Sequence, residues 1–172
     1  MKRDTEEACD MEQPSTSSRG NDSSVDAAEA ISTKPEIAES ALTSLEEPKY
    51  LLVDDNKVYQ KFIGKYFDRL ELKYQTAWNG QEAVDIYQAN PERCRLILLD
   101  ISMPVMDGMR AASIIRQYEK EKGLSPAIIV GLLATSLEEE RRRMVDEFGI
   151  DTTLEKPFSF YALKDLINTW PV

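Results

Sequence analysis

The sequence contains no histidine, and this absence excludes several classes of site. A Ser-His-Asp or Cys-His catalytic site, a zinc site built on histidine and a phosphohistidine all require an imidazole. The two cysteines, Cys9 and Cys94, are too few for a disulfide framework and indicate a reducing compartment. Any chemistry carried out by this chain therefore depends on carboxylates, hydroxyl groups, lysine or a hard cation.

Long apolar runs and an excess of basic residues are also missing. The longest apolar stretch, 127–134, is far shorter than the ~20 residues that a membrane helix needs, and the acidic N-terminus lacks the apolar region of a signal peptide. The 31 acidic and 21 basic residues give a net charge of −10, which disfavours a nucleic-acid-binding face. We therefore expect no nucleic-acid or membrane partner and a cytoplasmic location, with a nuclear location as the alternative.

Most of the negative charge belongs to the N-terminal segment. Residues 1–48 hold 12 acidic and 4 basic residues, a net charge of −8, and contain no aromatic residue. Such a segment cannot bury enough apolar surface to offset the entropy lost on ordering. We predict a disordered tail over 1–48, either a solvating extension or a regulatory arm, followed by one folded domain over 49–172.

Short apolar segments alternate with amphipathic ones from Lys49 onward. The strands are predicted at 49–53, 73–77, 95–99, 127–134 and 152–155. The helices are predicted at 57–70, 81–88, 108–122, 137–148 and 159–170. This alternation predicts an α/β fold in which helices cover both faces of a five-stranded parallel sheet. The common solution is the flavodoxin-like, doubly wound order 2-1-3-4-5.

Carboxylates follow two neighbouring strands of this predicted sheet. Asp54 and Asp55 come after the first strand and Asp100 after the third, at the point where such sheets bind their ligands. Three clustered carboxylates repel one another unless a cation joins them, and Mg²⁺ prefers oxygen ligands. Lys156 follows the fifth strand at the same edge and adds positive charge. Such a site is suited to a phosphoryl group, with an aspartate as its covalent acceptor.

The same residues form an ordered set of short motifs: Asp54-Asp55, Asp100, Met103-Pro104, Asp107-Gly108 and Lys156-Pro157-Phe158. Each motif alone is weak, since an Asp-Gly pair by itself indicates only a turn. In this order, on these strand ends, they resemble the pattern of response-regulator receiver domains of two-component and phosphorelay signalling. The resemblance covers residues 49–170 and implies the CheY-like version of the predicted fold.

The resemblance assigns a role to each position. Asp100 would accept a phosphoryl group from the phosphohistidine of a histidine kinase or a histidine-containing phosphotransfer protein. Asp54, Asp55, Asp100 and the backbone carbonyl of Ser102 would bind Mg²⁺, and Lys156 would contact the phosphoryl oxygens through a loop with a cis Lys156-Pro157 bond. The protein would then be a signalling switch rather than an enzyme. Its partner would dock near residues 62–66, and a downstream protein target would be reached by contact.

One position departs from the family pattern. Receivers usually carry a serine or threonine at the end of the fourth strand. Aligning the strand places Leu133 there, whereas counting back from Lys156 places Ala134 there, followed by Thr135. We favour Thr135 as the hydroxyl that contacts the phosphoryl group.

Two further observations bear on the mechanism. Thr153 stands where receivers often carry an aromatic switch residue, so rotation of a ring cannot be the readout. The uncertain hydroxyl leaves a pseudo-receiver, a binding module without phosphoryl chemistry, as the alternative function. A metal-dependent phosphatase is disfavoured, because Ile101 and Ser102 after Asp100 supply no second acid.

Overall fold

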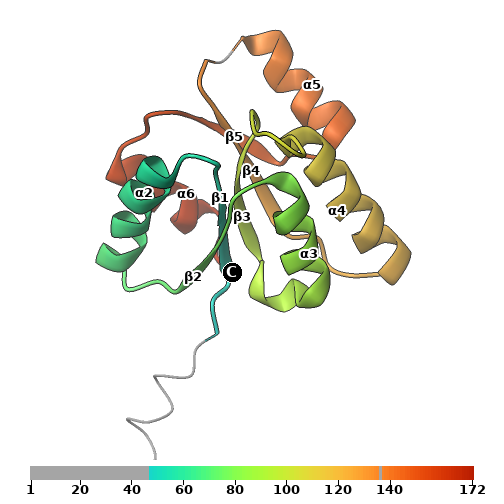
Figure 1. Ribbon diagram of the computed structural model, residues 1–172, viewed down its shortest axis with the longest axis horizontal. Coiled ribbons are helices and arrows are strands. Elements are labelled where there is room, and N and C mark those ends of the chain that lie inside the picture. The colour runs from blue at the N-terminus through green and yellow to red at the C-terminus, as the bar shows by residue number, and fades with distance from the viewer. Residues whose placement is uncertain (1–46, 136) are drawn as a thin grey trace, which may run out of the picture. The chain divides into compact units, whose positions relative to one another are not determined.

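The computed structural model describes residues 47–135 and 137–172, in which strands and helices alternate as predicted (Figure 1). Its strands are β1 (Tyr50–Val53), β2 (Tyr74–Ala77), β3 (Leu96–Asp100), β4 (Ile128–Leu133) and β5 (Thr152–Glu155). Its helices are α2 (Lys57–Arg69), α3 (Gly80–Ala89), the 3-10 turn Pro91–Arg93, α4 (Gly108–Lys122), α5 (Glu138–Phe148) and α6 (Phe160–Thr169). The tail predicted over 1–48 lies outside the described residues, apart from Glu47 and Pro48. None of the helices described is both long enough and apolar enough to span a bilayer.

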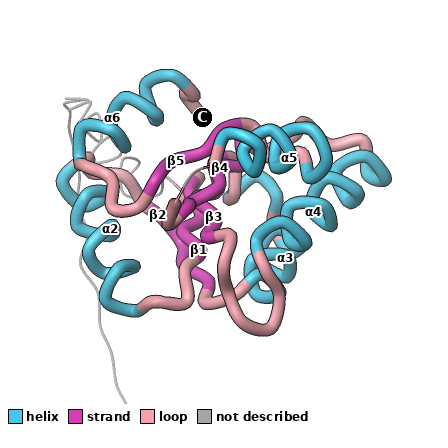
Figure 2. Tube along the Cα trace, turned by 90° about the horizontal axis from the view of Figure 1, so that it is seen from above, coloured by secondary structure: helices cyan, strands magenta, loops and turns pink. Residues whose placement is uncertain are grey.

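The strands form one parallel sheet in the order β2-β1-β3-β4-β5, which confirms the predicted topology. Seen from above, α2 and α6 lie on one side of the sheet and α3, α4 and α5 on the other (Figure 2). The register pairs Val53 with Leu99 and Leu99 with Gly131, so β1, β3 and β4 end at nearly the same level. The residues that follow these strands therefore meet at one edge of the sheet.

Two apolar layers hold the helices against the sheet, because successive strand side chains point to opposite faces. Leu51, Val53, Ile97 and Leu99 face α3, α4 and α5 in one layer. The other layer joins the sheet to α2 and α6 and contains Leu52, Ile63, Phe67, Leu96, Leu98, Leu132 and Leu163. Burial of both faces explains why β1, β3 and β4 are nearly continuous apolar runs rather than alternating ones.

Local signals place the helix ends close to the predicted positions. The Asn56 side chain accepts hydrogen bonds from the backbone N–H groups of Val58 and Tyr59, as expected for an N-cap. Asp107 caps α4 by accepting from the Arg110 N–H, and Gly123 ends that helix with a φ of 65°. These caps fix the starts of α2 and α4 beside the carboxyl ends of β1 and β3.

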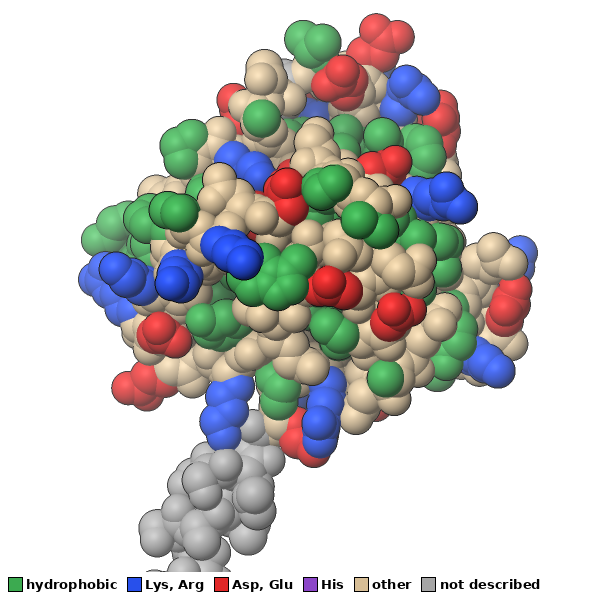
Figure 3. Space-filling view, viewed as in Figure 1, with side chains coloured by type: hydrophobic (Ala, Val, Ile, Leu, Met, Phe, Trp, Pro, Cys, Tyr) green, Lys and Arg blue, Asp and Glu red, His purple; other side chains and the backbone are tan. Residues whose placement is uncertain are grey.

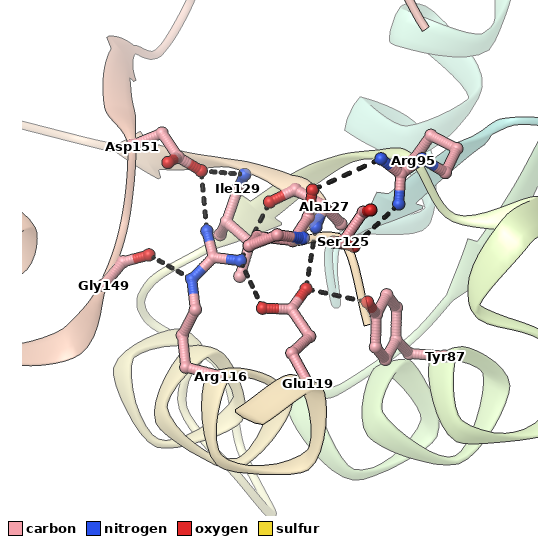
Figure 4. A network of polar contacts seen from close by, with 10 residues as sticks. Tyr87, Arg95, Arg116, Glu119, Ser125, Ala127, Ile129, Gly149 and Asp151 are labelled. Carbon is pink, nitrogen blue, oxygen red and sulfur yellow. Dashed lines mark hydrogen bonds and ion pairs between the residues drawn. The ribbon is translucent and has the colours of Figure 1, made fainter. Parts of the chain in front are cut away.

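One buried side chain of α4 is charged. Besides the apolar Ala112 and Ile115, the structure buries Glu119, which is 3% exposed. Its carboxylate accepts hydrogen bonds of 2.7 Å from the Tyr87 hydroxyl and from the Ala127 N–H (Figure 4). A charged residue is buried when it is paired and hydrogen-bonded, and Glu119 fulfils this condition.

Arg116 completes this polar network at the amino-terminal edge of the sheet (Figure 4). Its guanidinium forms ion pairs of 2.7 Å with Glu119 and Asp151 and donates to the backbone carbonyls of Ala127 and Gly149. These bonds join α4 to the start of β4 and to the turn between α5 and β5. Arg116 therefore holds together segments far apart in the sequence.

Candidate functional site

Three aspartates converge at the opposite, carboxyl-terminal edge of the sheet. Asp54 follows β1, and Asp100 is the last residue of β3. One carboxylate oxygen from each of Asp54, Asp55 and Asp100 lies within 4.8 Å of the others. Asp54 is fully buried, Asp100 is 5% exposed and Asp55 is exposed, so the cluster opens to solvent on one side. The predicted convergence of these residues is what the structure shows.

Lys156 brings a positive charge into the cluster from the loop after β5. Its Nζ lies 2.9 Å from Asp54 Oδ2 and 3.0 Å from Asp100 Oδ2. The Lys156 backbone N–H donates to the carbonyl of Leu133 at the end of β4, and the Lys156-Pro157 bond is cis. Lys156 thus bridges the two buried carboxylates.

The charges of this site do not balance. Three carboxylates against one ammonium leave a net charge of −2, and the other oxygens of Asp54 and Asp100 accept hydrogen bonds from the backbone N–H groups of Asn56 and Ser102. Burial raises the pKa of Asp100, against the opposing effect of Lys156. Burial alone would lower the pKa of Lys156, but hydrogen bonds to Asp54 and Asp100 raise it, so the ammonium stays charged. The excess charge matches a divalent cation.

The backbone beside Asp100 requires a glycine. The Gly108 N–H donates to the Ile101 carbonyl at 3.0 Å, and a Cβ on Gly108 would overlap the backbone oxygen of Asp100. Asp107-Gly108 is therefore more than the turn that the sequence indicated. Its glycine also lets the start of α4 approach the end of β3 closely.

Two residues of α2 that the sequence analysis did not single out also border the site. Gln60 is buried and its side-chain amide donates to the carbonyls of Ala77 (2.9 Å) and Asp54 (3.4 Å), which ties the ends of β1 and β2 together. The Tyr59 ring centroid lies 5.0 Å from Lys156 Nζ, and burial raises the pKa of Tyr59 to about 12. A polar residue on the apolar face of a predicted helix was the available signal for Gln60.

The end of β4 shows where the candidate hydroxyl lies. Asp100 pairs with Leu132 in the register, so Leu133 is one residue beyond it and is 4% exposed. Thr135 is exposed in the bend after β4, where it lines a hollow of about 370 Å³. The other lining residues are Ile101, Ser102, Met109, Leu133, Ala134, Glu140, Arg143 and Met144.

The arrangement suits the handling of a group with several negatively charged oxygens. Asp100 offers a carboxylate as nucleophile, Asp54 and Asp55 offer oxygen ligands for a hard cation, and Lys156 offers a fixed positive charge. Phosphoryl transfer depends chiefly on such positioning and on charge stabilisation of the transferred oxygens.

Known proteins share this fold and are similar to this chain in sequence. Residues 50–168 match the family model described as the response regulator receiver domain. The osmolarity two-component system protein SSK1 of Saccharomyces cerevisiae is 29% identical over 169 residues, covering 82% of this chain and 23% of that protein. The peroxide stress-activated histidine kinase mak1 of Schizosaccharomyces pombe is 34% identical over 119 residues, 69% of this chain and 7% of its own length. The chain thus spans less than a quarter of these relatives.

Solved structures agree with the sequence relatives. The receiver domain of S. cerevisiae Ssk1, crystallised with the histidine phosphotransfer signaling protein Ypd1, matches with a TM-score of 0.67 and 33% identity over 72% of this chain and 88% of that one. The receiver domain of the Pseudomonas aeruginosa sensor histidine kinase PA1611, with magnesium in its active-site cleft, matches with a TM-score of 0.61 and 30% identity over 72% and 97%. The chain belongs to the response regulator receiver domain family.

Proposed function

We propose that this chain is a phosphorelay receiver that accepts a phosphoryl group on Asp100 from a phosphohistidine of a partner protein. The observation that carries the proposal is the buried Asp100 carboxylate, held 3.0 Å from Lys156 Nζ beside two further aspartates. Ssk1, a receiver of similar sequence, was crystallised with a histidine phosphotransfer protein, which supports a donor of that class. The receiver then covers residues 49–172.

Mg²⁺ fits the donor set of the site. Asp54, Asp55 and Asp100 would hold the ion together with the backbone carbonyl of Ser102, and their net charge with Lys156 is −2. All of these ligands are oxygens, which Mg²⁺ prefers, and the exposure of Asp55 leaves room for the waters that the ion retains. When bound, the ion supplies positive charge to the phosphoryl oxygens.

The residues of the chain account for the transfer itself. A carboxylate oxygen of Asp100 forms the new bond to phosphorus while the bond from phosphorus to the donor imidazole nitrogen breaks, and the electron pair stays on that nitrogen. Before transfer, Lys156 pairs with the Asp100 carboxylate. After transfer, its ammonium would pair with the phosphoryl oxygens instead. The product is an aspartyl phosphate, and the chain acts as a switch rather than as an enzyme that turns over a substrate.

Thr135 is the proposed hydroxyl that reports the modification. It lies two residues beyond the buried Leu133, next to the hollow lined by Ile101 and Ser102. A small movement of the bend after β4 would bring its hydroxyl to the phosphoryl group. The β4–α5 segment would then change position on phosphorylation and alter contact with a downstream protein target.

The phosphotransfer partner is proposed to dock beside the site on α2. Phe62 is 43% exposed and its ring packs against Tyr66 with centroids 4.9 Å apart. Basic and hydrophobic side chains lie together over α2 on this face of the domain (Figure 3). A mixed apolar and basic face of this kind suits a protein partner.

The test is transfer of labelled phosphoryl from phosphorylated Ypd1 in the presence of Mg²⁺. The wild-type chain should become labelled, and the Asp100→Asn variant should not, because an amide oxygen is a poor nucleophile. Asp107→Asn is the matched control, since it removes a carboxylate close in sequence but outside the aspartate cluster. Labelling of the Asp100→Asn variant at the wild-type level would contradict the assignment.

The pseudo-receiver remains the second candidate because Leu133 offers no hydroxyl at the end of β4. It predicts that neither the wild type nor any variant is labelled and that Mg²⁺ leaves the fluorescence of Trp78 and Trp170 unchanged. A Thr135→Val variant separates the two candidates further. A functional hydroxyl predicts a changed lifetime of the aspartyl phosphate, whereas a binding module predicts no phosphorylated species at all.

A further inference from the structure

The ammonium of Lys156 contacts an aromatic face as well as two carboxylates. Its Nζ lies 2.9 Å from Asp54 Oδ2 and 3.0 Å from Asp100 Oδ2, and the centroid of the Tyr59 ring lies 5.0 Å away. A cation within about 6 Å of a ring centroid is attracted by the negative face of the ring. The Lys156 side chain is 18% exposed, so these three groups replace much of the water that would otherwise surround the charge.

Tyr59 is tied to the aspartate cluster through the start of α2. The Tyr59 N–H donates to the side chain of Asn56 at 3.1 Å, and the Asn56 N–H donates in turn to Asp54 Oδ1 at 2.8 Å. Asp54 is the same carboxylate that Lys156 contacts through its other oxygen. The first turn of α2 therefore carries the Tyr59 ring at a fixed place beside this ion pair.

The loop that carries Lys156 also packs on the ring. Phe158, two residues after Lys156, is 6% exposed, and its ring meets the Tyr59 ring edge to face, with centroids 6.0 Å apart and an angle of 87° between the planes. Such edge-to-face pairs stabilise a structure beyond the area that they bury. Tyr59 thus contacts the loop after β5 at two points, the ammonium of Lys156 and the ring of Phe158.

A lysine at this site benefits from such support because its side chain is flexible. The ammonium is a compact charge at the end of a four-carbon stem, which can place it in many positions. Phosphoryl transfer requires positive charge that is already in place where the phosphoryl oxygens will lie. A ring face attracts a cation without the directionality of a hydrogen bond. The ammonium can therefore turn from the Asp100 carboxylate to a phosphoryl oxygen while it stays on the ring.

We propose that Tyr59 is a positioning residue for phosphoryl transfer, whose ring face holds the Lys156 ammonium beside Asp100 where the phosphoryl oxygens will lie. This inference rests on the proposed function of Asp100. It adds a residue of α2 that acts through Lys156, and that gains and loses no proton in the transfer.

The test measures the rate at which acetyl phosphate and Mg²⁺ label the chain, because a donor of this size makes no protein contact with α2. Tyr59→Leu removes the ring and should slow labelling about three- to thirtyfold, the effect of losing one partly desolvated cation–π contact. Tyr59→Phe keeps the ring face and should be labelled at close to the wild-type rate.

Tyr118→Leu is the matched control. Tyr118, on α4, also has a lysine over its ring, with Lys122 Nζ 5.9 Å from the centroid, but α4 covers the opposite side of the sheet from α2 (Figure 2). The substitution removes the same side chain and the same kind of contact, and it should leave the labelling rate unchanged. Urea denaturation of each variant separates a loss of rate from a loss of stability.

Two further measurements separate positioning from a purely structural role. In a Lys156→Met background, Tyr59→Leu should cause no additional loss of rate, because the ring acts through the ammonium that is no longer there. The NMR signals of the Lys156 Hε protons should be shifted upfield by the ring in the wild type and in Tyr59→Phe. They should return to the usual position for lysine in Tyr59→Leu.

Several outcomes would overturn the inference. They are labelling of Tyr59→Leu at the wild-type rate, an equal loss of rate in Tyr118→Leu, and a loss of the same size in the Lys156→Met background. Unshifted Lys156 signals in the folded wild type would overturn it without any substitution. A wild-type chain labelled by neither acetyl phosphate nor phosphorylated Ypd1 would overturn the proposed function of Asp100 and this inference with it.

Discussion

Two groups of charged residues lie at opposite edges of the sheet, and they are built differently. At the amino-terminal edge, Glu119 and Asp151 face Arg116, and every contact is completed by a hydroxyl or a backbone group. At the carboxyl-terminal edge, three aspartates lie together, and Lys156 forms ion pairs with two of them, Asp54 and Asp100. In the first group the buried Glu119 carboxylate is fully hydrogen-bonded, Asp151 lies at the surface and the net charge is −1, whereas the second group has two buried carboxylates, a net charge of −2 and an opening to solvent.

This difference distinguishes a structural network from a binding site. A buried charge that is fully hydrogen-bonded ties segments of the chain together and leaves no capacity for a ligand. Carboxylates that repel one another weaken the free domain, but that repulsion becomes affinity when a cation arrives. Substitutions that remove charge should therefore have opposite effects on stability at the two edges.

The largest effect is expected from Arg116→Ala in the closed network. Loss of the guanidinium leaves Glu119 buried without its ion pair and frees the carbonyls of Ala127 and Gly149. The free energy of unfolding should fall by about 3–5 kcal/mol, measured by urea denaturation. Arg143→Ala is the control, since its pair with Glu147 is exposed and should contribute less than about 1 kcal/mol. Equal losses in the two variants would contradict the distinction.

Affinity for Mg²⁺ provides the next test. Asp55→Asn removes an exposed carboxylate from the open cluster and should weaken Mg²⁺ binding by about ten- to a hundredfold, measured by tryptophan fluorescence or calorimetry. Asp85→Asn changes the net charge equally on the exposed face of α3 and should leave the affinity as it is. Similar losses in both would mean that overall charge, rather than the cluster, sets the affinity.

Replacing a carboxylate by its amide should change the stability of the metal-free protein by a smaller amount, and in opposite directions at the two edges of the sheet. Asp100→Asn relieves repulsion with the neighbouring aspartates, and because burial already raises the Asp100 pKa, the neutral side chain suits the folded state better. Stability in a metal-free buffer should rise by about 1 kcal/mol, the scale of one like-charge contact. Glu119→Gln should instead lower it, since Arg116 loses its buried partner. A loss of stability in Asp100→Asn would refute the idea of stored repulsion.

The smallest effect concerns the response of the closed network to alkaline pH. Burial, followed by the hydrogen bond to Glu119, raises the pKa of Tyr87 above its usual 10.0. The folded chain then keeps a proton that the unfolded chain releases, so stability falls as pH rises above about 10. Tyr87→Phe should lower the free energy of unfolding by about 1 kcal/mol at neutral pH. It should also make the fall in stability with rising pH shallower, by the slope that one proton contributes. An unchanged slope would show that Tyr87 titrates alike in both states.

Much of the fold follows from patterns along the chain. Apolar runs ending at Asp54-Asp55 and at Asp100, with helices between, limit the sheet to few topologies, since crossovers are right-handed and helices must cover both faces. The strand edge that gathers Asp54, Asp100 and Lys156 follows from that topology. The cap at Asn56 also follows from the local sequence, because capping depends on neighbouring residues, whereas Asp107-Gly108 indicated only a turn.

Other features depend on contacts between segments that no local pattern specifies. The burial of Glu119 depends on two hydrogen-bond donors from other segments. These are the hydroxyl of Tyr87 in α3 and the N–H of Ala127 just before β4. The φ of 70° at Val105, in the loop between β3 and α4, was not predictable either, because a valine gives no local signal for a positive φ.

The sequence by itself narrowed the candidate chemistry, because the lack of histidine leaves carboxylates, hydroxyl groups, lysine or a hard cation as the candidate reacting groups. Only the tertiary structure decided how the charges pair. Ion pairing depends on distances of a few ångströms between side chains remote in the chain, as between Lys156 and Asp54 at 2.9 Å. Packing of the sheet and helices sets those distances, and it leaves one acidic group closed by Arg116 and the other open to a cation.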